Sequence, residues 1–153
     1  MQKVTTFLWF DNQAAEAAKY YCSIFKDSKI VNDSGMVVTF EIDGQRFMAL
    51  NGGPRFQFSE AISLFVWCKD QKEIDTLWKK LVRGGSEQAC GWLKDKYGLS
   101  WQIIPRDLPK LIRNPAAMQA MLGMKKIDLK ALKAAADGAK ATRKKRAKRS
   151  KRK

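Results

Sequence analysis

Residues 4–24, VTTFLWFDNQAAEAAKYYCSI, predict a buried strand followed directly by a helix, and this pair decides the fold. Residues 4–10 are rich in β-branched and aromatic side chains, which favour strands. The Asp-Asn pair that follows is typical of a helix N-cap, and apolar side chains then recur at helical spacing. Residues 61–81, AISLFVWCKDQKEIDTLWKKL, repeat this order at a shift of 57 residues. The chain is therefore predicted to contain two copies of one unit.

Each strand–helix pair is followed by further strands, which we predict at residues 29–33, 36–42, 45–51, 91–96 and 99–105. Asp43-Gly44 is a strong signal for a two-residue hairpin turn. Residues 52–58, GGPRFQF, are predicted to be a linker, because two glycines and a proline do not fit a regular element. The expected fold is α+β, with two βαβββ modules at about residues 3–53 and 59–106.

The remainder of the chain predicts short helices and then a basic tail. The expected helix caps and stops are Asn114-Pro115, Gly123, Asp128 and Gly138. Residues 138–153 hold 10 Lys or Arg and no acid, a composition that predicts a disordered tail. We therefore expect one domain at residues 1–137, of which residues 107–137 form a helical extension.

Composition limits the class of protein and the kind of site. The 153-residue chain has a net charge of +15 and no histidine, the residue most used as general base and as catalytic metal ligand. Its three cysteines, Cys22, Cys68 and Cys90, are odd in number and scattered, which favours reduced thiols in a cytoplasm. The sequence has no signal-peptide layout and no apolar run near roughly 20 residues, so we expect a cytoplasmic protein without a membrane partner.

Three segments carry a resemblance to a known family: FLWFDNQAAEAAKYYCSIF (7–25), ALNGGPRFQFSEAISLFVWC (49–68) and CGWLKDKYGLSWQIIP (90–105). They resemble the PhnB-like branch of the vicinal oxygen chelate superfamily, which includes glyoxalase and bleomycin-resistance proteins. Members of this branch often carry the label 3-demethylubiquinone-9 3-methyltransferase domain. MQAMLGMKKIDLKAL (118–132) is similar to the C-terminal extension of the branch. The resemblance implies a glyoxalase-like cupped sheet, a small-molecule ligand in the cup, and a homodimer.

In metal-dependent relatives, the ligands point into the cup from the first and last strands of each module. When these ligand positions are transferred to this sequence by strand register, they fall at Thr5, at Ala49 or Asn51, at Ser63 and at Gln102. None of these is His, Asp, Glu or Cys. Divalent cations prefer anionic oxygen or imidazole, so we predict neither a preformed metal site nor a cofactor. A metal-dependent lyase or dioxygenase of the same superfamily is the alternative. The sequence shows no glycine-rich loop between a strand and a helix, which a nucleotide-bearing methyl donor needs, so it does not support the methyltransferase label.

The candidate ligand pocket combines polar and aromatic side chains: Gln102, Asn51, Ser63, Thr5, Trp9, Trp67 and Arg55. The amides of Gln102 and Asn51 can orient a ligand, or they can bond neighbouring backbone groups. The tryptophans can wall a ligand or belong to the core. Arg55, on the linker, can hold an anionic group or remain a solvated loop charge.

No catalytic reaction is predicted, and whether the chain is an enzyme stays open. Cys90 is a weak candidate nucleophile, because its thiolate needs a base or cation and only Lys94 or Lys96 could serve. The alternative is an inert thiol. The basic tail, with Arg143, Lys144, Lys145 and Arg146, can bind nucleic acid without sequence preference or remain a solvated tail. A nucleic-acid-associated protein is therefore a further alternative.

Overall fold

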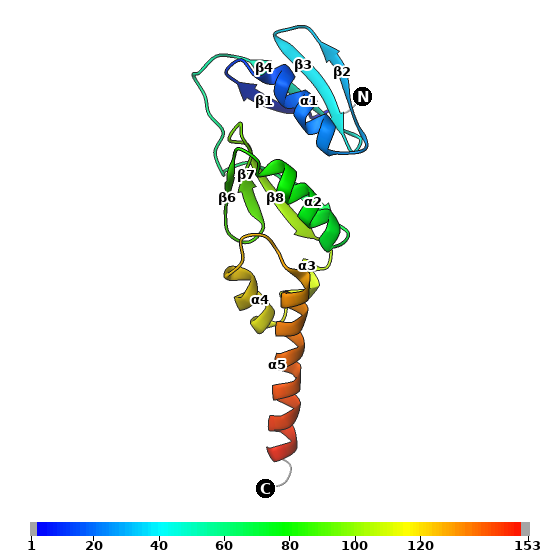
Figure 1. The fold of residues 1–153 in the computed structure, drawn as a ribbon, viewed down its shortest axis with the longest axis vertical. Coiled ribbons are helices and arrows are strands. Elements are labelled where there is room, and N and C mark those ends of the chain that lie inside the picture. Colours follow the sequence, from blue (N-terminus) through cyan, green and yellow to red (C-terminus); the bar gives the residue numbers. More distant parts are fainter. Residues whose placement is uncertain (1–2, 151–153) are drawn as a thin grey trace. The chain divides into compact units, whose positions relative to one another are not determined.

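The structure is a computed structural model that describes residues 3–150, with side chains described as far as residue 139. Its helices and strands follow the predicted order, with two further short elements at residues 86–87 and 108–111 that were not predicted (Figure 1). Contacts divide the chain into two units. The first comprises Met1–Ile62 with Tyr97–Leu99, and the second comprises Ser63–Lys96 with Ser100–Lys153.

The first unit is a four-stranded sheet with one helix on it. Its elements are β1 (Thr6–Phe10), α1 (Ala14–Ile24), β2 (Ser28–Asp33), β3 (Val37–Ile42) and β4 (Gln45–Asn51). The strand order is β1-β4-β3-β2; β1 runs parallel to β4, and the other neighbours are antiparallel. Leu8, Phe40 and Ala49 are buried on the face that α1 covers. The predicted turn at Asp43-Gly44 is confirmed, since both residues have the positive φ that such turns require.

The cap of α1 is not the one predicted. The Asp-Asn pair does not cap the helix; its N-cap is Gln13, which makes no side-chain cap bond. The Oδ1 atom of Asn51, at the end of β4, instead accepts from the N–H of Ala14 at 2.8 Å. Since the first N–H groups of a helix have no partner inside it, a strand 37 residues away supplies one.

The second unit repeats the architecture of the first. Its sheet contains β5 (Ser63–Cys68), β6 (Ser86–Glu87), β7 (Trp92–Lys94) and β8 (Ser100–Pro105), in the order β5-β8-β7-β6. The helix α2 (Gln71–Leu81) lies on one face, and Asp70 caps it as predicted, accepting from the N–H of Glu73 at 2.8 Å. The two predicted βαβββ modules are thus confirmed.

The shift of 57 residues holds for the helices but fails for the faces of the strands. It places α1 on α2 residue for residue, yet it equates Leu8, which is 3% exposed, with Phe65, which is 45% exposed. Three residues separate β1 from α1, whereas only two separate β5 from α2. Because side chains alternate along a strand, this one-residue difference moves each equivalent side chain to the opposite face.

The C-terminal extension packs on the second unit. It consists of α3 (Leu108–Leu111), α4 (Pro115–Leu122) and α5 (Leu129–Ser150). Ile104 of β8 forms one core cluster with Leu108, Ile127 and Leu132 of the extension. The loop before α5 also accepts two backbone hydrogen bonds, from the N–H of Cys90 at 2.8 Å and from that of Gly91 at 2.7 Å. The extension is therefore part of this unit's core.

The predicted stop at Gly138 is wrong, because α5 continues to Ser150 and gives a helical backbone where the sequence predicts a disordered tail. Ala, Lys and Arg are strong helix formers, and a single internal glycine costs only about 1 kcal/mol. The side chains of the tail residues Arg143, Lys144, Lys145 and Arg146 lie outside the described ones.

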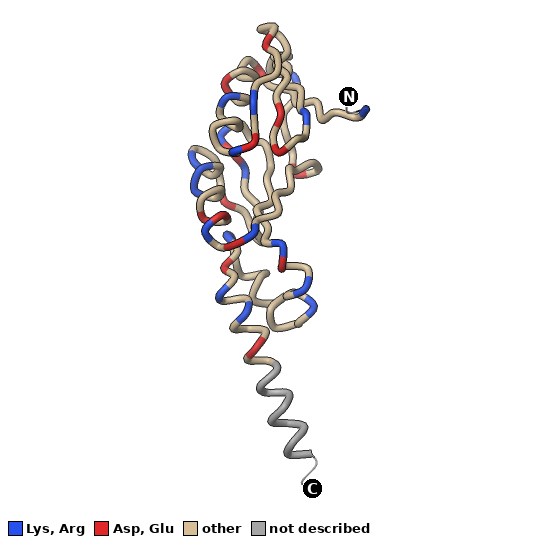
Figure 2. The backbone as a smooth tube through the Cα atoms, turned by 90° about the vertical axis from the view of Figure 1, so that its right-hand side faces the viewer, with Lys and Arg blue, Asp and Glu red and all other residues tan. Residues whose placement is uncertain are grey.

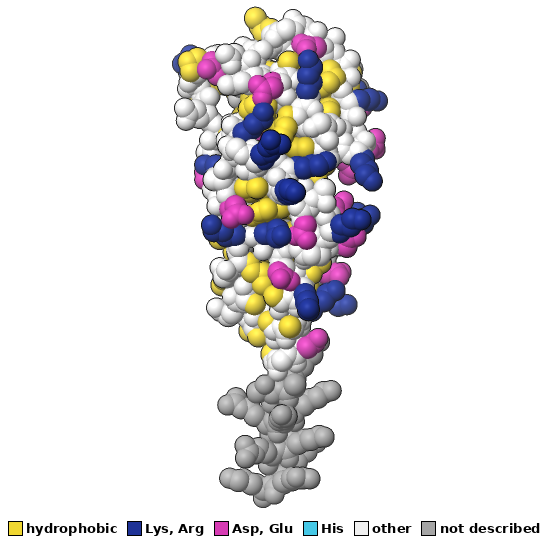
Figure 3. Space-filling view, viewed as in Figure 1, with side chains coloured by type: hydrophobic (Ala, Val, Ile, Leu, Met, Phe, Trp, Pro, Cys, Tyr) yellow, Lys and Arg dark blue, Asp and Glu magenta, His cyan; other side chains and the backbone are white. Residues whose placement is uncertain are grey.

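Charged side chains of both signs are interspersed over the described surface. Figure 2 shows Lys and Arg alternating with Asp and Glu along both units, and Figure 3 shows the same mixture on one face. Two ion pairs join the extension to its module, Lys126 with Asp75 and Lys125 with Glu87. Within residues 3–150, no helix has both the length and the apolar character that crossing a bilayer requires.

Candidate functional site

A pocket of about 300 Å³ lies in the second unit, between the C-terminal extension and the sheet face opposite α2. The sheet contributes five side chains to it: Phe65, Trp67, Trp92, Gln102 and Ile104. The loop before β7 and the extension contribute the others: Cys90, Leu108, Pro109, Ile112 and Met121. The wall is therefore almost wholly apolar.

Strand register explains why these sheet residues share one face. Gln102 on the central strand β8 lies opposite Phe65 on β5 and opposite Trp92 on β7. Two residues further along both strands, Trp67 lies opposite Ile104. Alternate residues of a strand point to the same side, so the intervening residues of β8 face α2. Those residues, Trp101 and Ile103, are at most 1% exposed.

Gln102 is the main polar group of the pocket. Its Nε2 donates to Oγ of Ser63 at 2.8 Å, across the β5–β8 pair. A carboxamide has two donor hydrogens and an acceptor oxygen, so this bond leaves the second Nε2 hydrogen and Oε1 for other partners. Three of the predicted site residues, Gln102, Ser63 and Trp67, thus occur together in this unit.

Cys90 lines the same pocket and has a positive φ of 59°. Its Sγ donates to the carbonyl oxygen of Met121 at 3.8 Å, and neither Lys94 nor Lys96 lines the pocket. The other two thiols have raised pKa values. Burial raises the pKa of Cys22, and burial, reinforced by the nearby carboxylates of Glu73 and Asp70, raises the pKa of Cys68 to about 12.

Asn51 has a structural role in the first unit. Besides accepting from Ala14, its Nδ2 donates to the carbonyl oxygen of Gly35 at 2.9 Å. It shares the α1 face with Ala49, which is fully buried. Its amide therefore satisfies backbone groups, one of the two roles considered from the sequence.

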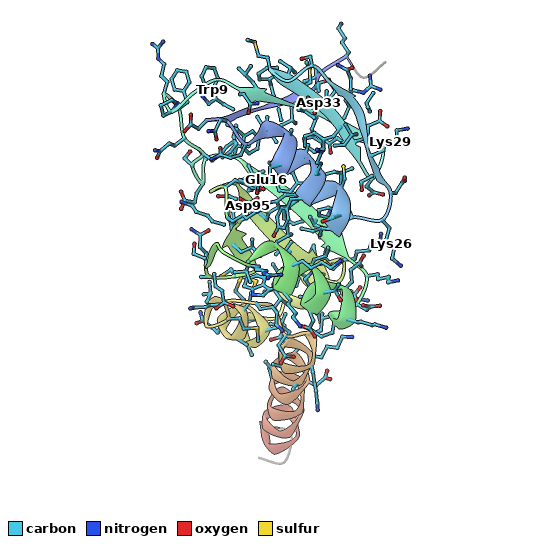
Figure 4. All side chains as sticks on the ribbon, turned by 45° about the horizontal axis from the view of Figure 1, so that its top comes forward. Trp9, Glu16, Lys26, Lys29, Asp33 and Asp95 are labelled. Atoms are coloured by element: carbon cyan, nitrogen blue, oxygen red, sulfur yellow. The ribbon has the colours of Figure 1, made fainter. Side chains whose placement is uncertain are left out.

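The remaining predicted pocket residues also belong to the first unit. Trp9 donates from Nε1 to the carbonyl oxygen of Gly53 at 2.8 Å, and its ring meets Phe56 edge to face. Arg55 lies over the Phe56 ring, 5.3 Å from its centroid. Thr5 immediately precedes β1. Figure 4 labels Trp9 and Lys29, which mark the two edge strands of this sheet.

The described residues offer no cluster of three typical ligands for a divalent metal ion. In the part of the chain that the structure describes, no three His, Cys, Asp or Glu side chains converge to hold one. On the open face of the first sheet, the carboxylate of Glu41 is bound by Arg46 at 2.7 Å and Lys29 at 3.2 Å. Hydrogen bonds from Arg46 and then Lys29 lower the pKa of Glu41, so two cations already neutralise this carboxylate.

Several pocket residues were not predicted as site residues. Phe65 and Ile104 could have been found by extending the alternation from Trp67 and Gln102 along their strands. No sequence pattern identified Leu108, Ile112 and Met121 as pocket residues. On a short helix, the pattern of an apolar residue that faces a pocket is the same as that of one in the core.

Comparison with known proteins gives one family. The model of the 3-demethylubiquinone-9 3-methyltransferase family matches residues 2–104. A putative 3-demethylubiquinone-9 3-methyltransferase, PhnB protein, from Bacillus cereus is 38% identical, with a TM-score of 0.61. That alignment covers 66% of this chain and 97% of the other.

More distant solved structures are also similar to parts of this chain. The protein PA1353 from Pseudomonas aeruginosa is 18% identical, with a TM-score of 0.54, over 66% of this chain and 95% of the other. A glyoxalase/bleomycin resistance protein from Albidiferax ferrireducens is 12% identical, with a TM-score of 0.49, over 63% of this chain and 92% of the other. No curated protein matches the chain.

Proposed function

The chain belongs to the 3-demethylubiquinone-9 3-methyltransferase (PhnB-like) family of the vicinal oxygen chelate superfamily, and from this premise we propose that it binds a small organic molecule in the pocket of its second unit. The observation that carries the proposal is the pocket: about 300 Å³, walled by apolar side chains, with the carboxamide of Gln102 on its wall. Ligand sites in proteins are typically apolar cavities in which a few fixed polar groups orient the ligand.

Binding is proposed to proceed without a metal ion. The positions carried over from metal-dependent relatives hold neutral side chains, and two of these, Ala49 and Asn51, lie on the helix-covered face of their sheet. An amide and a hydroxyl such as those of Gln102 and Ser63 are weak donors for a divalent cation. This donor set supports a binding pocket over a metal-dependent lyase or dioxygenase.

Methyl transfer, which the family name mentions, is not part of the proposal. Neither connection between a strand and its helix contains glycine: residues 11–13 read DNQ and residues 69–70 read KD. A nucleotide-bearing methyl donor is typically held at a glycine-rich strand–helix turn. We therefore propose binding alone, and leave the reaction unassigned.

Fluorescence titration with N-phenyl-1-naphthylamine, a neutral apolar probe, tests the proposal. We expect a saturable rise in probe fluorescence at one site per chain, and quenching of tryptophan emission because Trp67 and Trp92 line the pocket. An absence of saturable binding would show that the pocket does not accept small molecules.

Thiol labelling locates the probe. In a Cys22→Ser variant, Cys90 is the only thiol that is not fully buried, since Cys68 has no exposed surface. Alkylation with N-ethylmaleimide should then obstruct the pocket and weaken probe binding. The matched control is Cys22→Ser with Cys90→Ser, in which the same treatment should change nothing. Equal loss of binding in both proteins would place the probe elsewhere.

Nucleic-acid binding is a second candidate, favoured by the continuation of α5 into the basic segment. This segment carries 10 Lys or Arg and no acid between residues 138 and 153. Such a density of positive charge binds nucleic-acid phosphates by releasing counterions, without reading sequence.

A homodimer also remains a prediction, to be measured by light scattering.

A further inference from the structure

We infer that the ligand of this pocket is a compact, uncharged ring compound with a hydrogen-bond donor, and that the C-terminal extension selects it. The inference rests on the proposed function, because it specifies what the same pocket binds. Four properties of the pocket lead to it: its aromatic walls, its lack of charge, the orientation of one amide, and the origin of its roof.

The aromatic walls favour a flat ring. Phe65 and Trp67 project from the same face of β5, with ring centroids 4.6 Å apart, and each is almost half exposed. Trp92 adds a third ring from β7. Aromatic faces pack best against other rings, in stacked or edge-to-face geometry.

The lack of charge excludes an ionic ligand. None of the described Lys, Arg, Asp or Glu side chains lines the pocket. A carboxylate or ammonium group placed there would lose its hydration without gaining a counter-charge, and such burial is costly. The ligand is therefore neutral at the pH of the cell.

The amide of Gln102 favours a ligand group that can donate a hydrogen bond. Nε2 of Gln102 donates one of its two hydrogens to Ser63, so the second hydrogen and the acceptor oxygen Oε1 remain for a ligand. A ligand hydroxyl or N–H can donate to this oxygen. A ligand hydroxyl can also accept from the second N–H of Gln102, whereas an ether or ketone can accept from that N–H but has no hydrogen for Oε1.

The roof belongs to a part of the chain outside the family match. Leu108, Pro109, Ile112 and Met121 all lie beyond residue 104, where the match ends. The extension is fixed to its module by Gln71, which donates to the carbonyl oxygen of Ile127 and accepts from the N–H of Leu129. This fixed extension forms one wall of a site of about 300 Å³, a size that suits a compact ring.

Calorimetry with three naphthalene derivatives tests the ligand class. 2-Naphthol should bind about tenfold more tightly than 2-methoxynaphthalene, which lacks the donor, and 2-naphthoate should bind most weakly. Gln102→Leu should abolish the preference for the hydroxyl while retaining weak binding. Equal affinities for naphthol and its methyl ether, or tighter binding of the carboxylate, would overturn the inference.

Substitutions in α4 test the roof. Met121→Trp should reduce the affinity for 2-naphthol at least tenfold by filling the pocket. Leu122→Trp, a change of similar size at the next residue, which is 54% exposed, should not. If Met121→Trp does not fold, Met121→Ala replaces it and should raise the affinity for the larger N-phenyl-1-naphthylamine relative to 2-naphthol. Unchanged affinities in the folded Met121 variant would overturn the role of the extension.

The proposed function and the inferred ligand class would be contradicted by different results. If neither the naphthalenes nor N-phenyl-1-naphthylamine binds, the proposed function itself is wrong. If they bind without regard to the hydroxyl, Gln102 or Met121, the proposed function stands and the inferred ligand class is wrong.

Discussion

Gln102 occupies the position where the resemblance to metal-dependent relatives implies a carboxylate, and its partner is the hydroxyl of Ser63. Replacing Gln102 with Glu would supply one carboxylate beside neutral neighbours. A single carboxylate is not enough to hold a divalent ion tightly. We therefore expect elemental analysis to find no stoichiometric metal in the wild-type protein or in Gln102→Glu. One tightly held zinc, nickel or iron per chain in the wild type would contradict this expectation.

Cys68 makes stability depend on pH in the alkaline range. Burial, with the carboxylates of Glu73 and Asp70, raises the pKa of this thiol from 9.0 to about 12 in the folded protein. Between these values the unfolded chain loses the proton while the folded chain keeps it, so unfolding becomes more favourable as pH rises. The contribution is complete below pH 9 and is lost towards pH 12.

The expected result is a steeper fall of melting temperature above pH 9 for the wild type than for Cys68→Ala, which has no thiol to titrate at this position. Cys22, whose pKa burial also raises, is present in both proteins, so the difference isolates Cys68. Parallel curves for the two proteins would show that Cys68 ionises as easily in the folded state as in the unfolded one.

Among the elements, helices were predicted from the sequence more accurately than strand faces. The stripe Ile74, Leu77, Trp78 and Leu81 is buried along α2, as its helical spacing predicts. The faces of β1 and β5 depend on whether two or three residues connect each strand to its helix. A repeat aligned on the helices does not reveal that difference. Asn51 was predicted at the pocket from strand register with metal-dependent relatives, and in the structure its Oδ1 accepts from the N–H of Ala14 at the start of α1.

The attachment of the extension to α2 depends on the side chain of Gln71. Its Oε1 accepts from Leu129 at 2.9 Å, and its Nε2 donates to the carbonyl oxygen of Ile127 at 3.1 Å. Gln71→Ala leaves both backbone groups without these bonds, so we expect a loss of about 1–3 kcal/mol in the free energy of unfolding. Urea unfolding measures the loss. Lys72→Ala, at an exposed neighbour, is the control and should be nearly neutral.

The basic end of α5 is expected to contribute charge and little stability. Leu132 and Ala136, which are buried in the part of α5 whose side chains the structure describes, precede it and remain when residues 139–153 are removed. The truncated protein should therefore melt within a few degrees of the full chain but lose most of its retention on DNA at low salt. Changing Arg143, Lys144, Lys145 and Arg146 to Gln, which keeps the length, should weaken retention in the same direction. A large drop in melting temperature on truncation would show that this segment packs on the domain.

At the scale of the whole molecule, the two modules and their family could be predicted from the sequence, whereas the pocket could not. Its wall combines alternate residues of three strands with residues from two short helices. Alternation identifies the face of Gln102, but only the packing of Leu108 and Ile127 with Ile104 shows that the extension covers this face. No local pattern encodes that long-range contact, which depends on how the complete second unit packs.

The most direct test of the central claim is a crystal structure of the full chain with 2-naphthol. The account predicts the naphthalene ring in the pocket of the second unit, against Trp67 and beneath Met121, with its hydroxyl donating to Oε1 of Gln102. A ring bound at another place on the protein, or bound in this pocket with its hydroxyl turned away from Gln102, would contradict it.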